Sequence, residues 1–319
     1  MNKQEDNSLK EKLEHIGKVS LNYEYYSGED LYEDGSEAEL LDIVKKYDKY
    51  EYNRIIEEKK SWPILYHLSD IRGNIVGWIP FTKEDNILEI GAGCGAITGT
   101  LARYSKSVDC IELSRARSMV NAYRHREMDN INIIVGNFQN IEMGIEKQYD
   151  YITLIGVLEY AASYIASENP YKEFLDIIKK HLKSGGKVII AIENKYGLKY
   201  WAGCREDHLG TYFSGIEGYV ESKNVKTFSK NGLTRLLNDA GFDDIKYYYP
   251  YPDYKLPLAI YSDEYLPQKG SLNNNFRNFD HDRMLIFDES KVFDNLIEDG
   301  MFDIFSNSFL VIAGKEVKL

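Results

Sequence analysis

Short apolar runs alternate with longer amphipathic stretches from about residue 86 to residue 250. Apolar runs of this length predict buried β-strands, and amphipathic stretches of about ten residues or more predict helices. The expected strands are residues 87–90, 108–113, 131–135, 151–157, 187–192, 245–249 and 308–313. The expected helices are residues 96–104, 115–128, 171–182 and 228–240. Strands separated by helices in this way imply an α/β fold whose mostly parallel sheet is covered by helices on both faces.

The first 80 residues have a different pattern, because tyrosines and leucines are interleaved with charged side chains. Such a pattern predicts amphipathic helices that lie over another part of the molecule. We therefore expect a helical N-terminal cap over residues 1–80 and one domain over residues 81–319. Residues 194–226, rich in glycine and aromatic residues, are too long for a simple connection and predict a lid-like insertion after the fifth strand. Residues 262–300 are expected to be irregular.

The charge and cysteine content of the chain argue against several kinds of partner and site. The 319 residues carry 39 Lys and Arg against 51 Asp and Glu, a formal net charge of -12. This balance argues against a nucleic-acid substrate and against an anionic membrane surface. The three cysteines are scattered, which argues against a disulfide scaffold or a structural zinc site, and we expect no bound metal. With no apolar leader and no run long enough to span a bilayer, the sequence predicts a soluble cytoplasmic protein.

The sharpest local motif lies between the first predicted strand and the helix that follows it. Gly91, Gly93 and Gly95 stand at alternate positions there. Glycines allow a tight turn and let a ligand approach the main chain without a Cβ in the way. Glu112 ends the second predicted strand, where a carboxylate can accept both hydroxyls of a ribose. The motif therefore indicates a cofactor that contains a nucleoside.

The identity of that cofactor is open from these residues alone. The spacing of Gly91, Gly93 and Ala96 also satisfies the relaxed dinucleotide fingerprint, so an NAD-dependent dehydrogenase or epimerase is an alternative. A non-catalytic module that binds a nucleoside is a second one. With Glu89 and Gly95, however, the segment has the pattern E-x-G-x-G-x-G, which resembles motif I of the class I S-adenosylmethionine (SAM) methyltransferases.

Later segments extend this resemblance. Gly136-Asn137-Phe138 lies where the family contacts adenine, although the family usually has an acidic residue at the position of Asn137. The segment around Gly156 resembles the one beside the methyl donor, and LKSGGK at residues 182–187 resembles the turn before the fifth strand. The resemblance implies SAM as cofactor and a Rossmann-like seven-stranded sheet whose last strand is antiparallel.

A narrower resemblance rests on WPILYHLS at residues 62–69, Glu206-Asp207-His208, and YPYPDY at residues 249–254. These strings resemble a bacterial methyltransferase subgroup that accompanies glycosyltransferases of surface-polysaccharide assembly. The subgroup implies a glycan acceptor, and the aromatic residues near the predicted insertion suit a sugar or another small molecule. The oligomeric state stays open, with a homodimer as one option.

The resemblance and the residue types together assign roles. Glu89 would orient the glycine loop or the amino end of the methionine moiety, and Arg72 would contact the methionine carboxylate. The predicted cofactor-binding residues are Arg72, Glu89, Gly91, Gly93, Gly95, Glu112, Asn137, Phe138 and Gly156. We predict O-methylation of a small-molecule or glycan hydroxyl with His208 as general base, because histidine titrates near the operating pH. His281 is the second choice, and Glu159 and Glu193 are acidic alternatives.

Overall fold

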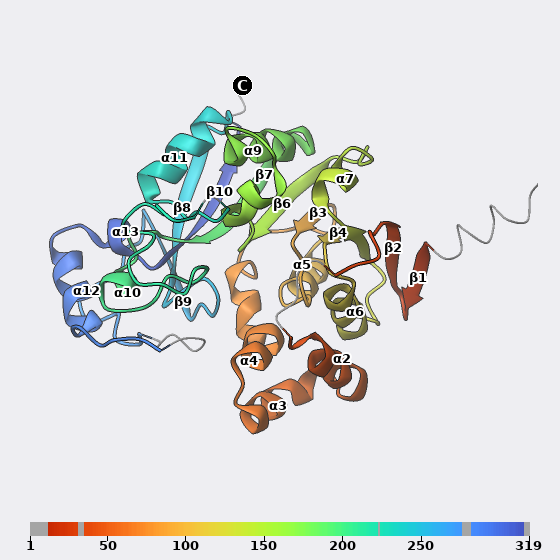
Figure 1. The fold of residues 1–319 in the computed structure, drawn as a ribbon, viewed down its shortest axis with the longest axis horizontal. Coiled ribbons are helices and arrows are strands. Elements are labelled where there is room, and N and C mark those ends of the chain that lie inside the picture. The colour runs from red at the N-terminus through yellow and green to blue at the C-terminus, as the bar shows by residue number, and fades with distance from the viewer. Residues whose placement is uncertain (1–11, 31–34, 223, 276–281, 316–319) are drawn as a thin grey trace, which may run out of the picture. The chain divides into compact units, whose positions relative to one another are not determined.

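A computed structural model describes residues 12–30, 35–222, 224–275 and 282–315 (Figure 1). The chain divides into two compact units. The first contains Met1–Thr153 and His181–Lys183, and the second contains Leu154–Lys180 and Ser184–Leu319.

The first unit contains the strands that carry the glycine motif. They are β1 (Leu13–Ile16), β2 (Val19–Tyr25), β3 (Asn86–Ile90), β4 (Ser107–Glu112), β5 (Ile131–Gly136) and most of β6 (Tyr149–Ile155). β3 pairs with β4, β4 with β5 and β5 with β2, all in parallel, and β1 pairs with β2 antiparallel. The prediction of a wholly helical N-terminal cap is therefore wrong at β1 and β2. Val19 and Leu21 are buried at alternate positions, a strand period that the surrounding charged residues obscure.

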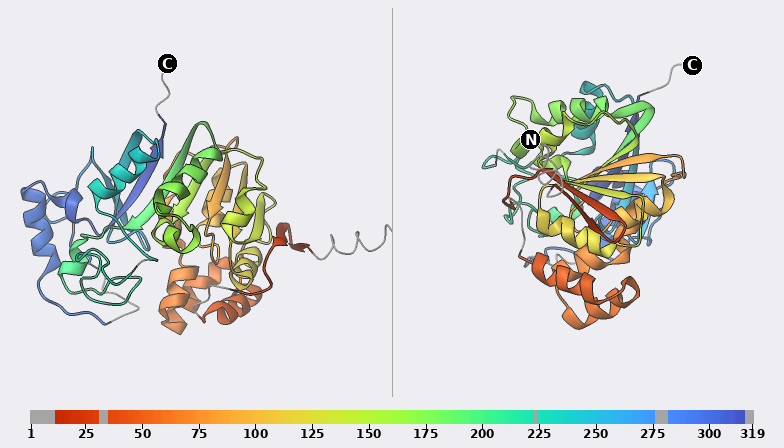
Figure 2. Two further views of the ribbon diagram at one scale, coloured as in Figure 1. Left: turned by 45° about the horizontal axis from the view of Figure 1, so that its top comes forward. Right: turned by 90° about the vertical axis from the view of Figure 1, so that its right-hand side faces the viewer.

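Among the described residues of the first unit, the helices begin at residue 37. They are α2 (Glu37–Lys46), α3 (Tyr52–Lys59), α4 (Trp62–Leu68), α5 (Thr98–Tyr104), α6 (Arg115–Arg124) and α7 (Phe138–Glu142), with 3₁₀ turns η1 (Lys49–Glu51) and η2 (Asp70–Ile75). Helices α2, α3 and α4 lie together beside α6 (Figure 1; Figure 2). Their buried side chains form one apolar cluster with Cys94 of the glycine loop and Val120 of α6. A buried ion pair joins α2 to α6, with 2.9 Å between Glu37 Oε1 and Arg117 Nε.

The second unit is built on β7 (Leu182–Glu193), β8 (Asp244–Tyr251), β9 (Ala259–Ser262) and β10 (Ser308–Gly314). β10 pairs antiparallel with both β7 and β8, so the prediction of an antiparallel last strand is confirmed. β9 adds a further antiparallel strand to β8. The helical elements are η3 (Leu158–Tyr160), α8 (Ala161–Tyr164), α9 (Pro170–Lys180), α10 (Leu198–Trp201), α11 (Lys230–Asp239), α12 (Glu289–Glu298) and α13 (Phe302–Phe305).

Two expectations about the second unit need correction. Residues 262–300 are not irregular throughout, because α12 forms there with Phe293 buried against a neighbouring aromatic side chain, Phe302. The insertion at residues 194–226 contains α10 and side chains as deeply buried as Tyr200 and Cys204. It is therefore packed into its own unit and does not form a loose flap.

The described residues form ten strands. In the first unit the hydrogen-bonded order is β1-β2-β5-β4-β3, and in the second it is β7-β10-β8-β9. β1, β2 and β9 are the strands that were not predicted. The expected Rossmann-like α/β fold is thus present with three more strands than predicted. In the part of the chain that the structure describes, no helix has the length and apolar character to cross a membrane.

Candidate functional site

The glycine loop of the first unit follows β3. Gly91, Gly93 and Gly95 have φ angles of 69°, 53° and 74°, a left-handed region that favours glycine. A Cβ atom at Gly93 would meet no other atom within 4 Å, whereas one at Gly95 would lie 2.2 Å from Oδ1 of Asn121 in α6. Gly93 therefore leaves open space beside the main chain, while Gly95 is required for close packing.

Glu112 lies beside this loop, at the end of β4. Its Oε2 accepts a hydrogen bond from the Gly93 amide at 2.7 Å, and its Oε1 accepts one from the Ser114 amide at 2.9 Å. Burial raises the pKa of the Glu112 carboxyl, although both hydrogen bonds oppose that shift. Glu112 therefore lies against the glycine loop, and its contact with a ribose stays a prediction.

Glu89 is buried in the middle of the same unit. The hydroxyl of Thr98, the first residue of α5, donates to Glu89 Oε2 at 2.6 Å. Burial raises the pKa of the Glu89 carboxyl to about 7, against the opposing effect of this hydrogen bond. Because Thr98 begins the helix after the loop, the contact supports the expectation that Glu89 orients the loop.

The remaining predicted cofactor residues of the first unit have local partners. Asn137 Oδ1 accepts from the backbone amide of Gln139 at 3.0 Å and so caps α7, and Phe138 is buried beside it. Arg72 lies in η2, buried, with its guanidinium 4.1 Å from the centre of the Tyr66 ring. The predicted contacts of Asn137 with adenine and of Arg72 with a carboxylate remain predictions.

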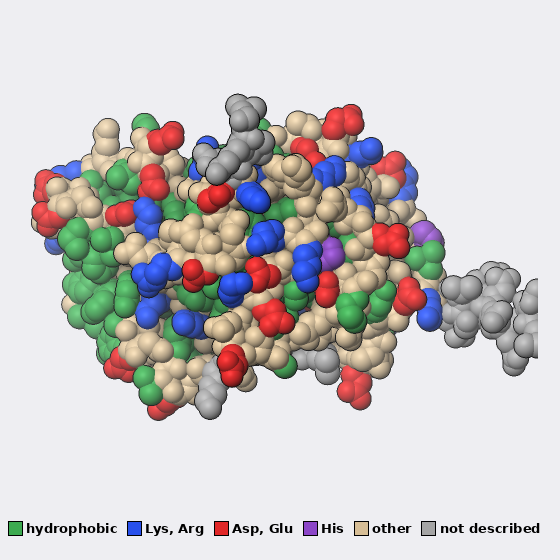
Figure 3. Space-filling view, turned by 90° about the horizontal axis from the view of Figure 1, so that it is seen from above, with side chains coloured by type: hydrophobic (Ala, Val, Ile, Leu, Met, Phe, Trp, Pro, Cys, Tyr) green, Lys and Arg blue, Asp and Glu red, His purple; other side chains and the backbone are tan. Residues whose placement is uncertain are grey.

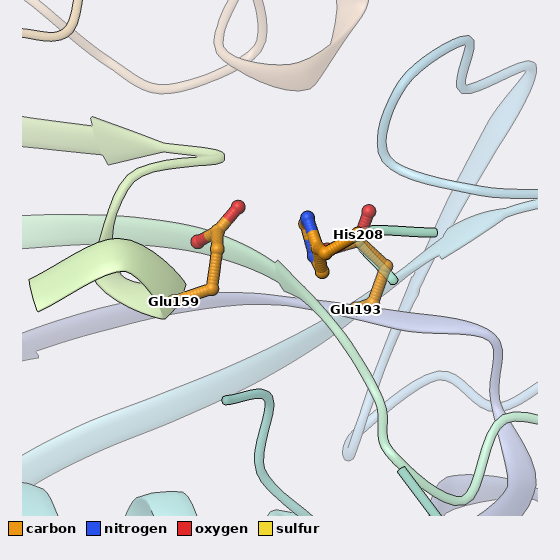
Figure 4. A group of neighbouring side chains, drawn as sticks. All are labelled: Glu159, Glu193 and His208. Atoms are coloured by element: carbon orange, nitrogen blue, oxygen red, sulfur yellow. The ribbon is translucent and has the colours of Figure 1, made fainter. Parts of the chain in front are cut away.

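The second unit contains a different kind of site, around the end of β7. Glu193 and Glu159 are buried, and the His208 side chain is 7% exposed. His208 Nε2 lies 3.3 Å from Glu193 Oε2, and His208 Nδ1 lies 2.9 Å from the hydroxyl of Tyr160. Figure 4 shows the Glu159 carboxyl group and the His208 ring facing each other, with Glu193 beside the ring. Gly156 belongs to the same unit, with a φ of 71°.

Two lysines complete this site. Lys255 Nζ lies 2.8 Å from Glu193 Oε1 and also pairs with Asp207. Lys199 Nζ lies 2.9 Å from Asp207 and 2.8 Å from Asp253. We call this set the charged cluster; its members are Glu159, Glu193, Lys199, Asp207, His208, Asp253 and Lys255.

The charged cluster brings together strings that the sequence singles out separately. Glu206-Asp207-His208 and the YPYPDY string at residues 249–254 both contribute to it. Sequence reasoning missed the two lysines, although Lys255 directly follows the second string. Lys255 could have been suspected because it follows a motif already singled out, but no recognisable sequence spacing marks either lysine as part of a site.

The electrostatics of the charged cluster bear on the predicted general base. Burial alone would lower the pKa of the His208 imidazole, but the contact with Glu193 and the negative charges of Glu193, Glu159 and Glu206 together outweigh it and raise this pKa to about 9. His208 is therefore mostly a cation at neutral pH, and only its small uncharged fraction can accept a proton there. Burial, followed by the charge of Glu193, raises the pKa of the Glu159 carboxyl to about 8. His208 as general base stays a prediction, and the alternative His281 lies outside the described residues.

A sequence profile described as a methyltransferase domain matches residues 65–247, which is more than half of the chain. This chain belongs to the methyltransferase domain family. The resemblance to class I SAM-dependent methyltransferases is thereby confirmed, and with it SAM as the methyl donor. The match includes the glycine loop, Glu112 and most of the charged cluster, but not Asp253 or Lys255.

Curated relatives of this methyltransferase differ in their acceptors. A mitochondrial ubiquinone biosynthesis O-methyltransferase of Dictyostelium discoideum is 27% identical over 46% of this chain and 52% of its own length. A tRNA (guanine-N(7)-)-methyltransferase of Mycoplasma mobile is 28% identical over 41% of this chain and 68% of its own length. The chain thus spans about half to two thirds of these two relatives. Because one of them acts on tRNA, the expectation that nucleic acid is excluded as an acceptor is not supported.

Solved structures give a weaker likeness. A SAM-dependent methyltransferase from Archaeoglobus fulgidus has a TM-score of 0.47 and 16% identity, covering 83% of this chain and 100% of its own. This degree of likeness supports no conclusion about the acceptor.

Proposed function

We propose that this methyltransferase moves the methyl group of SAM to a hydroxyl oxygen of a small molecule or glycan. The observation that carries the cofactor half of the proposal is the hydrogen bond from the Gly93 amide to Glu112 Oε2. It fixes a buried carboxylate next to a loop whose main chain is open at Gly93. A carboxylate so placed suits the ribose hydroxyls of a nucleoside.

The remaining cofactor roles are proposed on weaker support. Arg72 would supply a cation for the methionine carboxylate, and Glu89, through Thr98, would hold the start of α5 in place. Asn137 and Phe138 would lie against the adenine, and Gly156 would lie near the donor methyl group. The side-chain oxygen of Asn137 already accepts the hydrogen bond that caps α7.

Methyl transfer from SAM does not require a nucleophilic side chain of the protein. Methyl transfer from a sulfonium is an in-line displacement in which the acceptor oxygen forms a bond to the methyl carbon as the bond from carbon to sulfur breaks. The protein mainly aligns the two molecules and excludes water. A neutral hydroxyl must also lose its proton, and His208 can take that proton only in the fraction that is uncharged near its pKa of about 9.

The acceptor class rests on the charged cluster and on net charge. Two of the three strings that resemble the polysaccharide-associated subgroup meet in the cluster, which supports a glycan. On the face shown in Figure 3, Lys and Arg side chains are interspersed with Asp and Glu, and the chain has a net charge of -12. A phosphate backbone is bound chiefly by clustered Lys and Arg, so these charges favour the smaller acceptor over RNA.

Calorimetric titration tests the cofactor. We expect SAM and S-adenosylhomocysteine to bind and NAD⁺ not to bind. Glu112→Ala should weaken SAM binding by about 1.5–3 kcal/mol, the scale of a lost charged hydrogen-bond partner. Glu146→Ala, which changes an exposed carboxylate of the same unit, is the matched control. Binding of NAD⁺ in place of SAM would overturn the proposal.

Transfer of a labelled methyl group tests the acceptor. The enzyme and methyl-labelled SAM are incubated with hydroxyl-bearing oligosaccharides, with small phenols and, separately, with unmodified tRNA. We expect label in an O-methyl group of one of the first two classes. Label in tRNA would show that the protein is a methyltransferase but that the proposed acceptor class is wrong. SAM binding without any methyl transfer would favour a non-catalytic binding module.

A further inference from the structure

The three residues in Figure 4, which include the proposed general base His208, share a further property. Glu159 Oε2 is buried and, within the described residues, has no hydrogen-bond partner, while Glu193 Oε2 and His208 Nε2 are buried 3.3 Å from each other with no well-aligned hydrogen bond. Each of the three residues also offers one donor atom that lies within 4.8 Å of the other two. Leaving buried polar atoms unsatisfied is costly, so such atoms call for a ligand. We propose that Glu159, Glu193 and His208 bind a divalent transition-metal ion, Mn²⁺ or Zn²⁺.

The distance between two of the donor atoms suits coordination of a single ion. Protein nitrogen and oxygen ligands lie about 2.1 Å from such ions, so neighbouring ligand atoms at angles of roughly 90–110° are roughly 3.0–3.4 Å apart. His208 Nε2 and Glu193 Oε2 are 3.3 Å apart. Glu159 comes from a different segment, and one of its carboxylate oxygens lies within 4.8 Å of the ligand atoms of the other two residues.

The atoms that do not face the site are already held. His208 Nδ1 lies 2.9 Å from the Tyr160 hydroxyl, which orients the ring with Nε2 toward the carboxylates. Glu193 Oε1 pairs with Lys255 Nζ at 2.8 Å and accepts from the Tyr254 hydroxyl at 3.2 Å, which leaves Oε2 toward His208. Metal-binding histidines and carboxylates are generally fixed through their second atom in this manner.

The surrounding charges also favour a cation. The described groups that face this site include five carboxyl groups, which are Glu159, Glu193, Glu206, Asp207 and Asp253. Among the described residues, the positive groups paired with them are Lys199, Lys255 and, when it is protonated, His208. Both lysines pair with Asp207, and Lys255 contacts the oxygen of Glu193 that faces away from His208. A divalent ion would offset negative charge that is expensive to bury alone.

The donor set selects among ions. One imidazole with two carboxylates suits Mn²⁺ or Zn²⁺ better than Mg²⁺, which prefers an all-oxygen shell. Three protein ligands leave at least one position for water or for an oxygen-bearing molecule. The proposal concerns the second unit alone and does not rest on the proposed methyl transfer.

Metal binding is tested on the purified full-length protein without SAM. The chain is stripped with a chelator, dialysed and titrated with Mn²⁺, with free Mn²⁺ followed by its electron paramagnetic resonance signal. We expect saturable binding of one ion per chain, displacement by Zn²⁺, and weak competition by Mg²⁺. Co²⁺ should give a visible absorption spectrum typical of mixed nitrogen and oxygen ligands.

Variants assign the site. Glu159→Gln and His208→Gln should each weaken Mn²⁺ affinity at least tenfold, and circular dichroism checks that both variants are folded. His181→Gln is a matched control, because His181 Nε2 lies 3.3 Å from Glu142 Oε2 in the first unit without belonging to the trio. It should bind Mn²⁺ as the parent does. Absence of Mn²⁺ and Zn²⁺ binding by the folded parent, or equal affinity in all three variants, would overturn the proposal, whatever the result of SAM titration.

Discussion

The glycine loop and the charged cluster satisfy their polar groups in opposite ways. In the loop, main-chain amides of Gly93 and Ser114 hold the Glu112 carboxylate. In the cluster, side chains from distant segments hold one another, and Glu159 Oε2 has no hydrogen-bond partner among the described residues. The loop is therefore a scaffold that is complete in itself, whereas the cluster is a set of charges that depends on every member.

The largest effect should come from breaking the cluster at its central carboxylate. Glu193→Gln removes the negative charge that faces Lys255 and His208 while nearly preserving side-chain volume. Removing one partner of a buried ion pair costs about 3–5 kcal/mol, so the free energy of unfolding should fall by that amount in urea at neutral pH. Glu298→Gln, which alters an exposed pair with Lys269, should cause no measurable change. An equally small effect at Glu193 would show that the charges of the cluster are not interdependent.

A matched pair of glycine variants separates packing from ligand access in the loop. Gly95→Ala must displace the buried Asn121 side chain and adopt a left-handed backbone, which together should cost roughly 2–5 kcal/mol of unfolding free energy. Gly93→Ala meets no neighbouring atom and should cost only about 1–2 kcal/mol from the backbone. We expect Gly93→Ala to lose more SAM affinity relative to its loss of stability. If both variants lose stability equally, the space beside Gly93 is not open.

The buried carboxyl group of Glu89, near the glycine loop, should make the stability of the protein depend on pH. Burial raises the pKa of Glu89 from 4.5 to about 7, so the folded state binds this proton more tightly than the unfolded state. The stabilising contribution is complete below about pH 4.5 and is lost as the pH rises through 7. Glu89→Gln removes this dependence. Compared with the variant, the parent should lose about 3 kcal/mol between pH 4.5 and pH 7.5. Parallel stability curves for the two proteins would place the Glu89 pKa near its ordinary value.

The smallest expected effect concerns the cap of α7. Asn137→Ala removes the oxygen that accepts from the Gln139 amide and should lower the free energy of unfolding by about 1 kcal/mol. Asn137→Asp preserves the cap and restores the acidic residue usual in the family. Affinity for SAM that is unchanged in both variants would limit Asn137 to its structural role.

The sequence predicts the loop well and the cluster poorly for a physical reason. Gly91 to Gly95 are consecutive in the chain, and left-handed turns leave a direct mark on residue choice. Glu159, Glu193 and His208 come from separate segments, so their proximity depends on the complete packing of the second unit. Single residues of the cluster can be suspected from the strings around them, but their partners and their pKa values require the fold.

The same limit explains the errors in secondary structure. The seven predicted strands have continuous apolar runs, whereas β1 and β9 are edge strands and β2 is paired on its outer side with the four-residue strand β1. Edge strands keep one side toward solvent, and the four residues of β9 are all only partly buried. Their alternating pattern is too short to stand out from the charged residues around them.

Because β2 pairs with β5, the segment before residue 60 contributes to the sheet of the first unit. Proteolysis that removed it would uncover the hydrogen-bonding edge of β5 and take Glu37 away from the buried guanidinium of Arg117. A bare strand edge is a template for association between chains. The truncated protein should therefore aggregate in solution while its glycine loop is still folded.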